Sequence, residues 1–298
     1  MNKGNWLLLL AAMIWGMSLV AQQGGMEHMG PWSFTAIRCT LGGLSMIPLV
    51  AFLDKNKKRA ENNFDWKKDT VKTIKPAALC AVFLCTCIMC QQYGLLHTGV
   101  GKGAFITALY IFITPVLCLI LGQKVEKKIW IAVIFALAGL YMITMSSGFD
   151  AINKGDIIML GAALSYSIFI VVVDRVDESI DTVKMACMQF LMLGLFCFIP
   201  AFILEAGDIT WENIMLSITP ILYAGIISCA GGYTLQMLGQ KTADASKASL
   251  ILSSETVFSL LAGFLILHEI LKPKEYIGCI IMTIAIIISL LPSKNNQK

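Results

Sequence analysis

Ten runs of about 20 apolar residues, separated by short polar breaks, divide the whole sequence. A helix needs roughly 20 mainly apolar residues to cross the ~30 Å hydrocarbon core of a bilayer, so each run is long enough to be a transmembrane helix. The longest break, residues 54–75, is polar and basic, and we expect it to lie on the membrane surface. The predicted spans are residues 5–23, 32–53, 76–96, 102–122, 129–147, 156–174, 182–204, 215–238, 246–267 and 275–292.

The composition agrees with a chain that is mostly embedded in lipid. Hydrophobic residues make up 57% of the sequence and charged residues 14%, whereas a soluble domain has about 25% charged residues. A single soluble core could not cover this much apolar surface. The expected fold class is an all-α membrane protein with ten transmembrane helices, which excludes a soluble enzyme, a nucleic-acid-binding protein and a secreted disulfide scaffold.

The ten cysteines all lie within apolar runs. Because no polar loop carries a cysteine, the pattern does not indicate a disulfide framework. The densest group, Cys80 to Cys90, is joined by no histidine or carboxylate, and we interpret it as small, polarisable side chains buried in a helix. We expect no metal and no other cofactor.

Lysine and arginine are distributed unequally between the two sides of the predicted helices. If the N-terminus is placed inside, 18 of the 23 basic residues fall on the inside, 4 fall on the outside, and Arg38 lies within a span. The inside loops of membrane proteins carry an excess of Lys and Arg. We therefore expect a multi-pass protein of the plasma (inner) membrane of a prokaryote, with both termini in the cytoplasm. The basic residues suit anionic lipid headgroups and do not indicate nucleic acid.

The two halves of the chain repeat each other weakly. Each half holds five spans, an odd number, so the second half must enter the membrane inverted relative to the first. We predict one five-helix repeat over residues 1–148 and an inverted one over residues 149–298, packed around a central cavity, as in many secondary transporters. The aligned pairs are Gly4 with Gly155, Trp15 with Tyr166 and Arg38 with Gln189 at an offset of 151 residues, and Gln92 with Gln236 at an offset of 144.

Short motifs in a fixed order make the chain resemble the drug/metabolite transporter superfamily, and within it the EamA-type ten-helix carriers. The resemblance implies movement of small metabolites, commonly amino acids or their relatives, and often outward. The motifs are AAMIWGMS at 11–18, FTAIR at 34–38, YGLLHTG at 93–99, GAFITAL at 103–109, ASKASL at 245–250 and SETVF at 254–258.

The sequence departs from the pattern of these carriers in two places. Gly-Glu-Arg usually follows spans four and nine, but residues 122–124 read Gly-Gln-Lys and residues 268–270 read His-Glu-Ile. Span nine often contains Glu-Pro, whereas Glu255 is followed by Thr256. Without the proline, the kink that it would cause is not expected.

Glu255 and Arg38 are the ionisable residues that lie deepest in the predicted spans. A carboxylate near mid-depth must face a wet cavity, pair with another group or stay protonated, and each of these suits a proton-coupled carrier. It could equally form a structural hydrogen bond to Ser253 or Ser254. Arg38 could hold a substrate carboxylate, pair with Glu255 as a gate, or bind the backbone carbonyls of neighbouring helices.

Aromatic and amide side chains at matching repeat positions are the remaining candidates. Gln92 and Gln236 would meet near the pseudo-twofold axis and offer donors and acceptors to a polar metabolite, although interhelical packing would explain them as well. Trp15 with Ser18, and its counterpart Tyr166, could line a cavity or simply pack. Tyr93 belongs to the same class, as do Tyr110 and Tyr233.

These features favour a secondary transporter that moves small metabolites by alternating access, with amino acids or related compounds as the best guess, export as the direction and protons as a possible coupling ion. The partners that we expect are the small-molecule substrate and the lipid bilayer, with the chain a monomer or a homodimer. The alternatives are a membrane-embedded sensor and an intramembrane enzyme that retains the fold without transport. No nucleotide-binding motif of a primary pump is present in the sequence.

Overall fold

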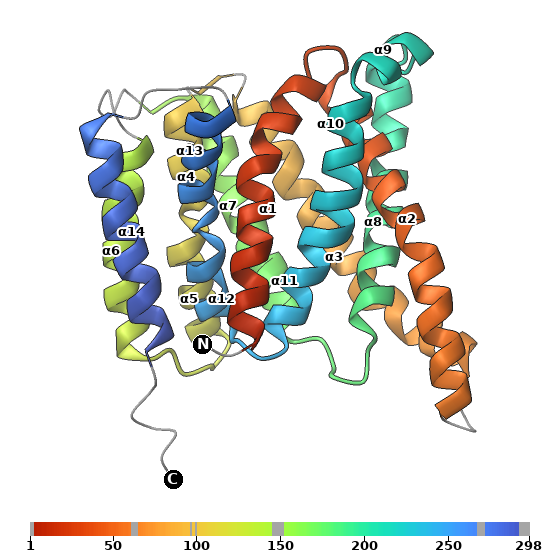
Figure 1. Cartoon of the computed structure of the whole chain (residues 1–298), viewed down its shortest axis with the longest axis horizontal. Helices are drawn as coiled ribbons and strands as arrows, with labels where there is room; N and C mark the ends of the chain where they lie inside the picture. Colours follow the sequence, from red (N-terminus) through yellow and green to blue (C-terminus); the bar gives the residue numbers. More distant parts are fainter. Residues whose placement is uncertain are drawn as a thin grey trace.

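The structure, a computed structural model, describes residues 3–60, 65–95, 97–98, 100–144, 152–266 and 272–291, and the elements in these ranges are helices (Figure 1). The first half contains α1 (Lys3–Gly25), α2 (Pro31–Ala60), α3 (Trp66–Leu95), α4 (Val100–Ala108), α5 (Tyr110–Ile120) and α6 (Lys127–Thr144). The second half contains α7 (Lys154–Asp174), α8 (Thr182–Leu204), α9 (Trp211–Leu216), α10 (Ile218–Leu222), the π-helix η1 (Tyr223–Gly232), α11 (Tyr233–Gln240), α12 (Ala245–Leu252), α13 (Glu255–Ile266) and α14 (Pro273–Leu290).

The described helices group into ten membrane crossings, which confirms the predicted fold class. Eight helical segments are long and apolar enough on their own to span a bilayer. Two of the eight consist of more than one element: the first of α4 and α5, the second of α10, η1 and α11. The other two crossings are α1 and the pair α12 and α13. Large apolar side chains point outward at Ile120, Ile203 and Leu265, each at least 68% exposed, as expected for a surface in contact with lipid.

The polar segment 54–75 is mostly helical, and its place on the membrane surface stays a prediction. Residues 54–60 continue α2 and residues 66–75 form the first turns of α3, so both helices are longer than the predicted spans 32–53 and 76–96. Hydropathy marks only the part of a helix that lies in lipid, and these two helices extend beyond it. The His-Glu-Ile motif at 268–270 lies outside the described residues.

Two sides of the bundle are named by α1. The Lys3 side is where α1 begins, α2 ends and α14 ends, and the Gly25 side is where α1 ends and α2 begins. In Figure 1 the Lys3 side is at the bottom. Because each half contributes five crossings, α7 begins on the Gly25 side and ends on the Lys3 side, opposite to α1.

Glycines at two helix crossings show the inverted symmetry directly. A Cβ on Gly43 of α2 would lie 2.7 Å from the Leu191 side chain of α8, and a Cβ on Gly194 of α8 would collide with Thr40 of α2. Gly43 and Thr40 align with Gly194 and Leu191 at the offset of 151 residues. The α2–α8 contact is therefore repeated by a twofold rotation, and small residues permit the close approach of the two backbones.

The α6–α14 contact follows the same rule at the opposite edge of the bundle (Figure 1). A Cβ on Gly139 would lie 2.8 Å from the carbonyl oxygen of Gly278 and from the amide nitrogen of Met282, while a Cβ on Gly278 would lie 2.7 Å from the carbonyl oxygen of Gly139 and 2.8 Å from Ile143. Gly278 follows Gly139 by 139 residues, and Met282 follows Ile143 by the same offset. The pseudo-twofold axis thus passes through the α2–α8 and α6–α14 crossings.

The fourth and ninth crossings are interrupted at the same repeat position. Leu109 separates α4 from α5, and Ser253 and Ser254 separate α12 from α13. Leu109 aligns with Ser253 at the offset of 144 residues. At each interruption an amide, that of Leu109 or of Ser254, donates to the carbonyl three residues before it at 3.1 Å. The second interruption occurs without a proline and places Glu255 at the start of α13.

Candidate functional site

A cavity of about 370 Å³ lies between the two halves and extends from mid-depth toward the Gly25 side. The residues that line its outer part belong to the end of α1, the end of α6 and the start of α14, namely Gln22, Thr144 and Glu275. Its floor is formed by six large or charged side chains from both halves: Trp15, Arg38, Tyr110, Tyr166, Tyr233 and Glu255.

Aromatic rings form most of the cavity floor. The rings of Trp15 and Tyr233 lie 4.5 Å apart between centroids, and those of Tyr110 and Tyr166 lie 4.8 Å apart in an edge-to-face arrangement. Phe169 and Phe190 support Tyr233 from behind with centroid distances of 6.1 and 5.2 Å. Such packing fixes the ring planes and presents flat apolar walls to a bound molecule.

Glu255 lies near the middle of its crossing, because it follows the start of α12 by ten residues, or about 15 Å of helix. Its side chain is half-buried and faces the cavity. The Tyr110 hydroxyl is a neighbour of this carboxylate, but it forms no hydrogen bond to any described residue. Among the described residues, no lysine or arginine forms an ion pair with Glu255.

Arg38 is, besides Glu255, an ionisable residue that lines the cavity. Its side chain is only 4% exposed, and its guanidinium lies 5.6 Å from the centre of the Phe34 ring. The Nε atom has no hydrogen-bond partner within the described part of the chain, and no carboxylate there lies within ion-pair distance. A guanidinium stays charged even when it is buried, so Arg38 places a positive charge beside the cavity.

The structure brings four of the eight predicted site residues to the cavity. Trp15, Arg38, Tyr166 and Glu255 line it. Ser18 lies one helical turn from Gln22, a lining residue whose amide donates to the Ser18 hydroxyl at 3.5 Å.

The other three predicted residues, Tyr93, Gln92 and Gln236, are not among the cavity-lining residues. The Tyr93 hydroxyl accepts a hydrogen bond from Trp32 Nε1 at 2.7 Å. The two glutamines do not meet. Gln92 donates to Thr35 at 3.3 Å near the Gly25 side, and Gln236 donates to Gln240 at 3.0 Å near the Lys3 side. Inversion sends equivalent residues to opposite sides unless the axis passes through them, so matching positions alone do not imply contact.

Several lining residues carry no strong sequence signal. Tyr110 and Tyr233 belong to the aromatic class that was considered, but Gln22, Thr107, Ser228 and Ser259 are small or polar residues of a kind found at many helix contacts. The positions of Ser228 and Tyr233 depend on η1, whose ten-residue π-helix alters the register of the eighth crossing. Apolar runs do not predict such a π-helix. The described residues hold no cluster suited to a metal ion.

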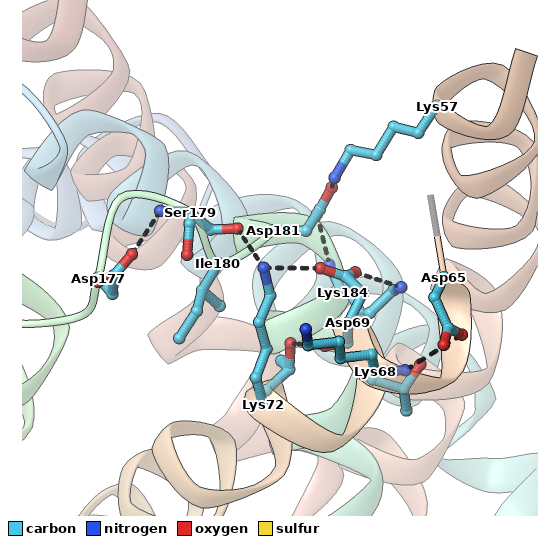
Figure 2. A network of polar contacts seen from close by, with 12 residues as sticks. Lys57, Asp65, Lys68, Asp69, Lys72, Asp177, Ser179, Ile180, Asp181 and Lys184 are labelled. Atoms are coloured by element: carbon cyan, nitrogen blue, oxygen red, sulfur yellow. Dashed lines mark hydrogen bonds and ion pairs between the residues drawn. The ribbon is translucent and has the colours of Figure 1, made fainter. Parts of the chain in front are cut away.

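Ion pairs join helices of both halves on the Lys3 side of the bundle (Figure 2). The Lys184 ammonium on α8 lies 2.6 Å from Asp69 on α3 and 2.9 Å from Asp54 on α2. Lys57 lies 2.6 Å from Asp181, whose carboxylate also caps the start of α8. Burial alone would raise the pKa of Asp181, but hydrogen bonds from Lys57 and from two backbone amides outweigh it and hold the pKa below its ordinary value.

The Gly25 side carries the repeat-related counterpart of these contacts. Glu205 aligns with Asp54 at the offset of 151 residues, and it accepts hydrogen bonds from the backbone amides of Trp32 at 3.2 Å and Ser33 at 2.8 Å. Ser33 in turn aligns with Lys184. Both ends of the α2–α8 pair are thus joined by a carboxylate at equivalent positions, through charge on the Lys3 side and through a helix N-terminus on the Gly25 side.

An inverted pair of five-helix units around an aromatic-walled cavity that contains two ionisable side chains and reaches one side is the architecture of a membrane carrier. Comparison with known proteins agrees. The model of the EamA-like transporter family matches residues 2–145 and again residues 153–291. The chain belongs to the EamA-like transporter family, within the drug/metabolite transporter superfamily, and is a membrane transporter rather than an enzyme.

Related proteins are similar over most of their length. The chain is 27% identical to an uncharacterized transporter of Archaeoglobus fulgidus, covering 94% of this chain and 83% of that protein. It is 26% identical to the uncharacterized transporter YwfM of Bacillus subtilis, covering 98% and 96%. A crystal structure of a protein with 14% identity superposes with a TM-score of 0.76 over 97% of this chain and 99% of that one, which shows a shared fold.

Proposed function

We propose that the chain is a secondary transporter for small zwitterionic metabolites, best represented by amino acids with an apolar side chain. The observation that supports this substrate class is the pair of opposite charges, Glu255 and Arg38, which face one aromatic-walled cavity without an ion-pair partner among the described residues. A zwitterion supplies an ammonium group for the carboxylate, a carboxylate for the guanidinium and an apolar body for the rings.

The energetics of burial favour a substrate that supplies both charges. A lone charge in the bilayer centre costs at least about 2.5 kcal/mol, and a charge-assisted hydrogen bond recovers part of that cost. The volume of about 370 Å³ falls at the small end of the range of ligand pockets, which suits a single metabolite.

Protons are the coupling ion in this proposal. Glu255 must be neutral, hydrated or paired, so a proton and the substrate ammonium are alternative ways to satisfy the same carboxylate. Glu255 would bind the substrate ammonium while the cavity turns outward and a proton while it turns back inward. Each cycle then exchanges one substrate molecule for one proton. Proton antiport through Glu255 would then drive export.

The positive-inside rule assigns the Lys3 side to the cytoplasm in this proposal, with both termini there, in the plasma (inner) membrane of a prokaryote. The described basic residues of α2 and α3 beyond Asp54 support this orientation, since Lys55, Lys58, Lys67 and Lys68 are exposed on that side. The cavity then faces outward, and the structure corresponds to the state that releases an exported substrate.

Flux measurements in proteoliposomes test the proposal. Labelled phenylalanine should show saturable flux that responds to an imposed pH gradient, whereas phenethylamine, which lacks the carboxylate, and 3-phenylpropionate, which lacks the ammonium, should compete weakly. Arg38→Gln should reduce the preference for phenylalanine over phenethylamine, and Glu255→Gln should reduce it over 3-phenylpropionate. Absence of flux for every amino acid, from protein shown to be folded, would refute the substrate class and favour a sensor.

A further inference from the structure

Gln189 on α8 is a buried amide without a hydrogen-bond partner in the part of the chain that the structure describes. Its side chain is fully buried, and neither Nε2 nor Oε1 forms a hydrogen bond to any residue in the described ranges. Buried polar groups are nearly always hydrogen-bonded, so an amide with both ends unsatisfied needs an explanation. Gln236 on the neighbouring α11 adds a second unsatisfied acceptor, its Oε1 atom, and is also fully buried.

The symmetry of the bundle relates Gln189 to Arg38. Arg38 follows the first residue of α2 by seven positions, and Gln189 follows the first residue of α8 by seven positions. Each therefore lies about 10 Å inside the bundle, Arg38 from the Gly25 side and Gln189 from the Lys3 side. The twofold contact of Gly43 and Gly194 lies on the same two helices, so the equivalence rests on observed packing as well as on the sequence offset.

The cavity reaches only one member of this pair. Arg38 lines it, while Gln189 is fully buried nearer the Lys3 side, where the ion pairs of Lys184 join α2, α3 and α8. Alternating access in such carriers moves one half against the other around a fixed site. If the state open to the other side is related to the present one by the pseudo-twofold axis, each residue takes in that state the environment of its counterpart. The environment of Arg38 in the present state is a cavity wall.

We infer that Gln189 is a substrate-contacting residue of the state that is open to the Lys3 side, where it donates its amide N–H to the carboxylate end of the substrate that Arg38 holds in the present state. This inference rests on the proposed function for the nature of the substrate. It explains the missing partners, because a residue that contacts water or substrate in one state is left unsatisfied when the other state closes over it.

Sided labelling tests the accessibility of position 189 without any substrate. Gln189→Cys is treated with a membrane-impermeant charged thiol reagent from each side of oriented vesicles, and peptide mass spectrometry locates the adduct. Because the reaction is irreversible, it accumulates even if the Lys3-open state is a minor one. The expected result is modification from the Lys3 side, with Arg38→Cys modified from the Gly25 side.

Two positions on the same helix serve as controls. Native Cys197 and the variant Leu193→Cys are both fully buried on α8, and both should stay unmodified from either side. If position 189 also stays unmodified while Arg38→Cys reacts, the inference is overturned. The result does not depend on amino-acid transport, so a failed substrate class and a failed inference give different outcomes.

Sided kinetics with labelled phenylalanine test the contact itself. Gln189→Leu should raise KM by about tenfold or more for phenylalanine presented on the Lys3 side, while KM from the Gly25 side stays within twofold. Gln189→Asn, a shorter amide, should restore part of the difference. A structural role would change the amount of folded protein or the maximal rate on both sides equally, and that result would contradict the inference.

Discussion

Replacing Lys184 by methionine removes the cation that joins α2, α3 and α8 on the Lys3 side. The Lys184 side chain is 4% exposed, and its ammonium lies within 3 Å of Asp69 and Asp54, whose side chains are 7% and 21% exposed. Removing one partner of a buried ion pair costs about 3–5 kcal/mol. Lys72 remains 3.0 Å from Asp69, and the Asp54 side chain is partly exposed, so we expect the lower end, about 3 kcal/mol.

This loss falls on the closed state alone if the three groups separate and become hydrated when the Lys3 side opens. About 3 kcal/mol then shifts the ratio of open to closed molecules by roughly 100-fold. Ala248 is a suitable reporter, because it is fully buried and aligns with the cavity-lining Ala104 at the offset of 144 residues. The rate at which Ala248→Cys reacts with a charged thiol reagent from the Lys3 side should rise by a comparable factor.

The matched control is Lys58→Met, which removes an exposed lysine from the same end of α2. It should leave the labelling rate within twofold of the parent. Unchanged labelling in Lys184→Met, with the protein folded, would show that these ion pairs do not hold the Lys3 side closed. Slower labelling would contradict the direction of the effect.

Three further outcomes are expected. Glu255→Gln should abolish the response of flux to a pH gradient without unfolding the protein, and retained coupling would exclude this carboxylate as the proton carrier. Gly139→Leu should lower stability by about 1–3 kcal/mol or more in detergent unfolding, because its Cβ would meet the Gly278 backbone, whereas Gly207→Leu, with open space around it, should not. Asp181→Asn should flatten the acid limb of the stability curve.

The sign of the Asp181 effect follows from its surroundings. Its folded-state pKa lies below the ordinary value of 3.8, so its contribution to stability is present at pH values above 3.8 and is lost as the pH falls through the folded-state pKa. Unfolding measured by denaturant at pH 3 and pH 6 should therefore differ more in the parent than in Asp181→Asn. An equal difference in both proteins would exclude the Lys57–Asp181 pair as a source of acid lability.

The crossings could be predicted from the sequence because lipid imposes a length and an apolar composition on each of them. The last residues of α2 (54–60) and the first residues of α3 (66–75) could not be predicted as helix in this way. A helix is free to be polar where it extends beyond the hydrocarbon core, as these residues do. The family model matches two segments, which fits the weak repeat that begins at Gly4 and Gly155. The repeat limits of 1–148 and 149–298 stay a prediction.

The candidate site could be predicted where a residue is costly to bury. Glu255 and Arg38 stand out because charges are rare in membrane spans, and Trp15 and Tyr166 because large rings occupy equivalent positions. Gln22 and Ser259 are missed because their side chains suit helix packing equally well. The pairing of Gln92 with Gln236 fails for a geometric reason, since an offset identifies equivalent residues and does not identify neighbours.

Counterflow is the most direct test of a carrier that exposes one cavity to the two sides in turn. Vesicles that contain the purified protein are loaded with unlabelled phenylalanine and diluted into a trace of labelled phenylalanine at constant pH. A carrier that alternates should draw the label transiently above its equilibrium level inside the vesicles, and an Arg38→Gln variant should reduce that peak. Label that rises only to equilibrium, or that does not enter, from protein shown to be folded, would contradict alternating transport of a zwitterion through this cavity.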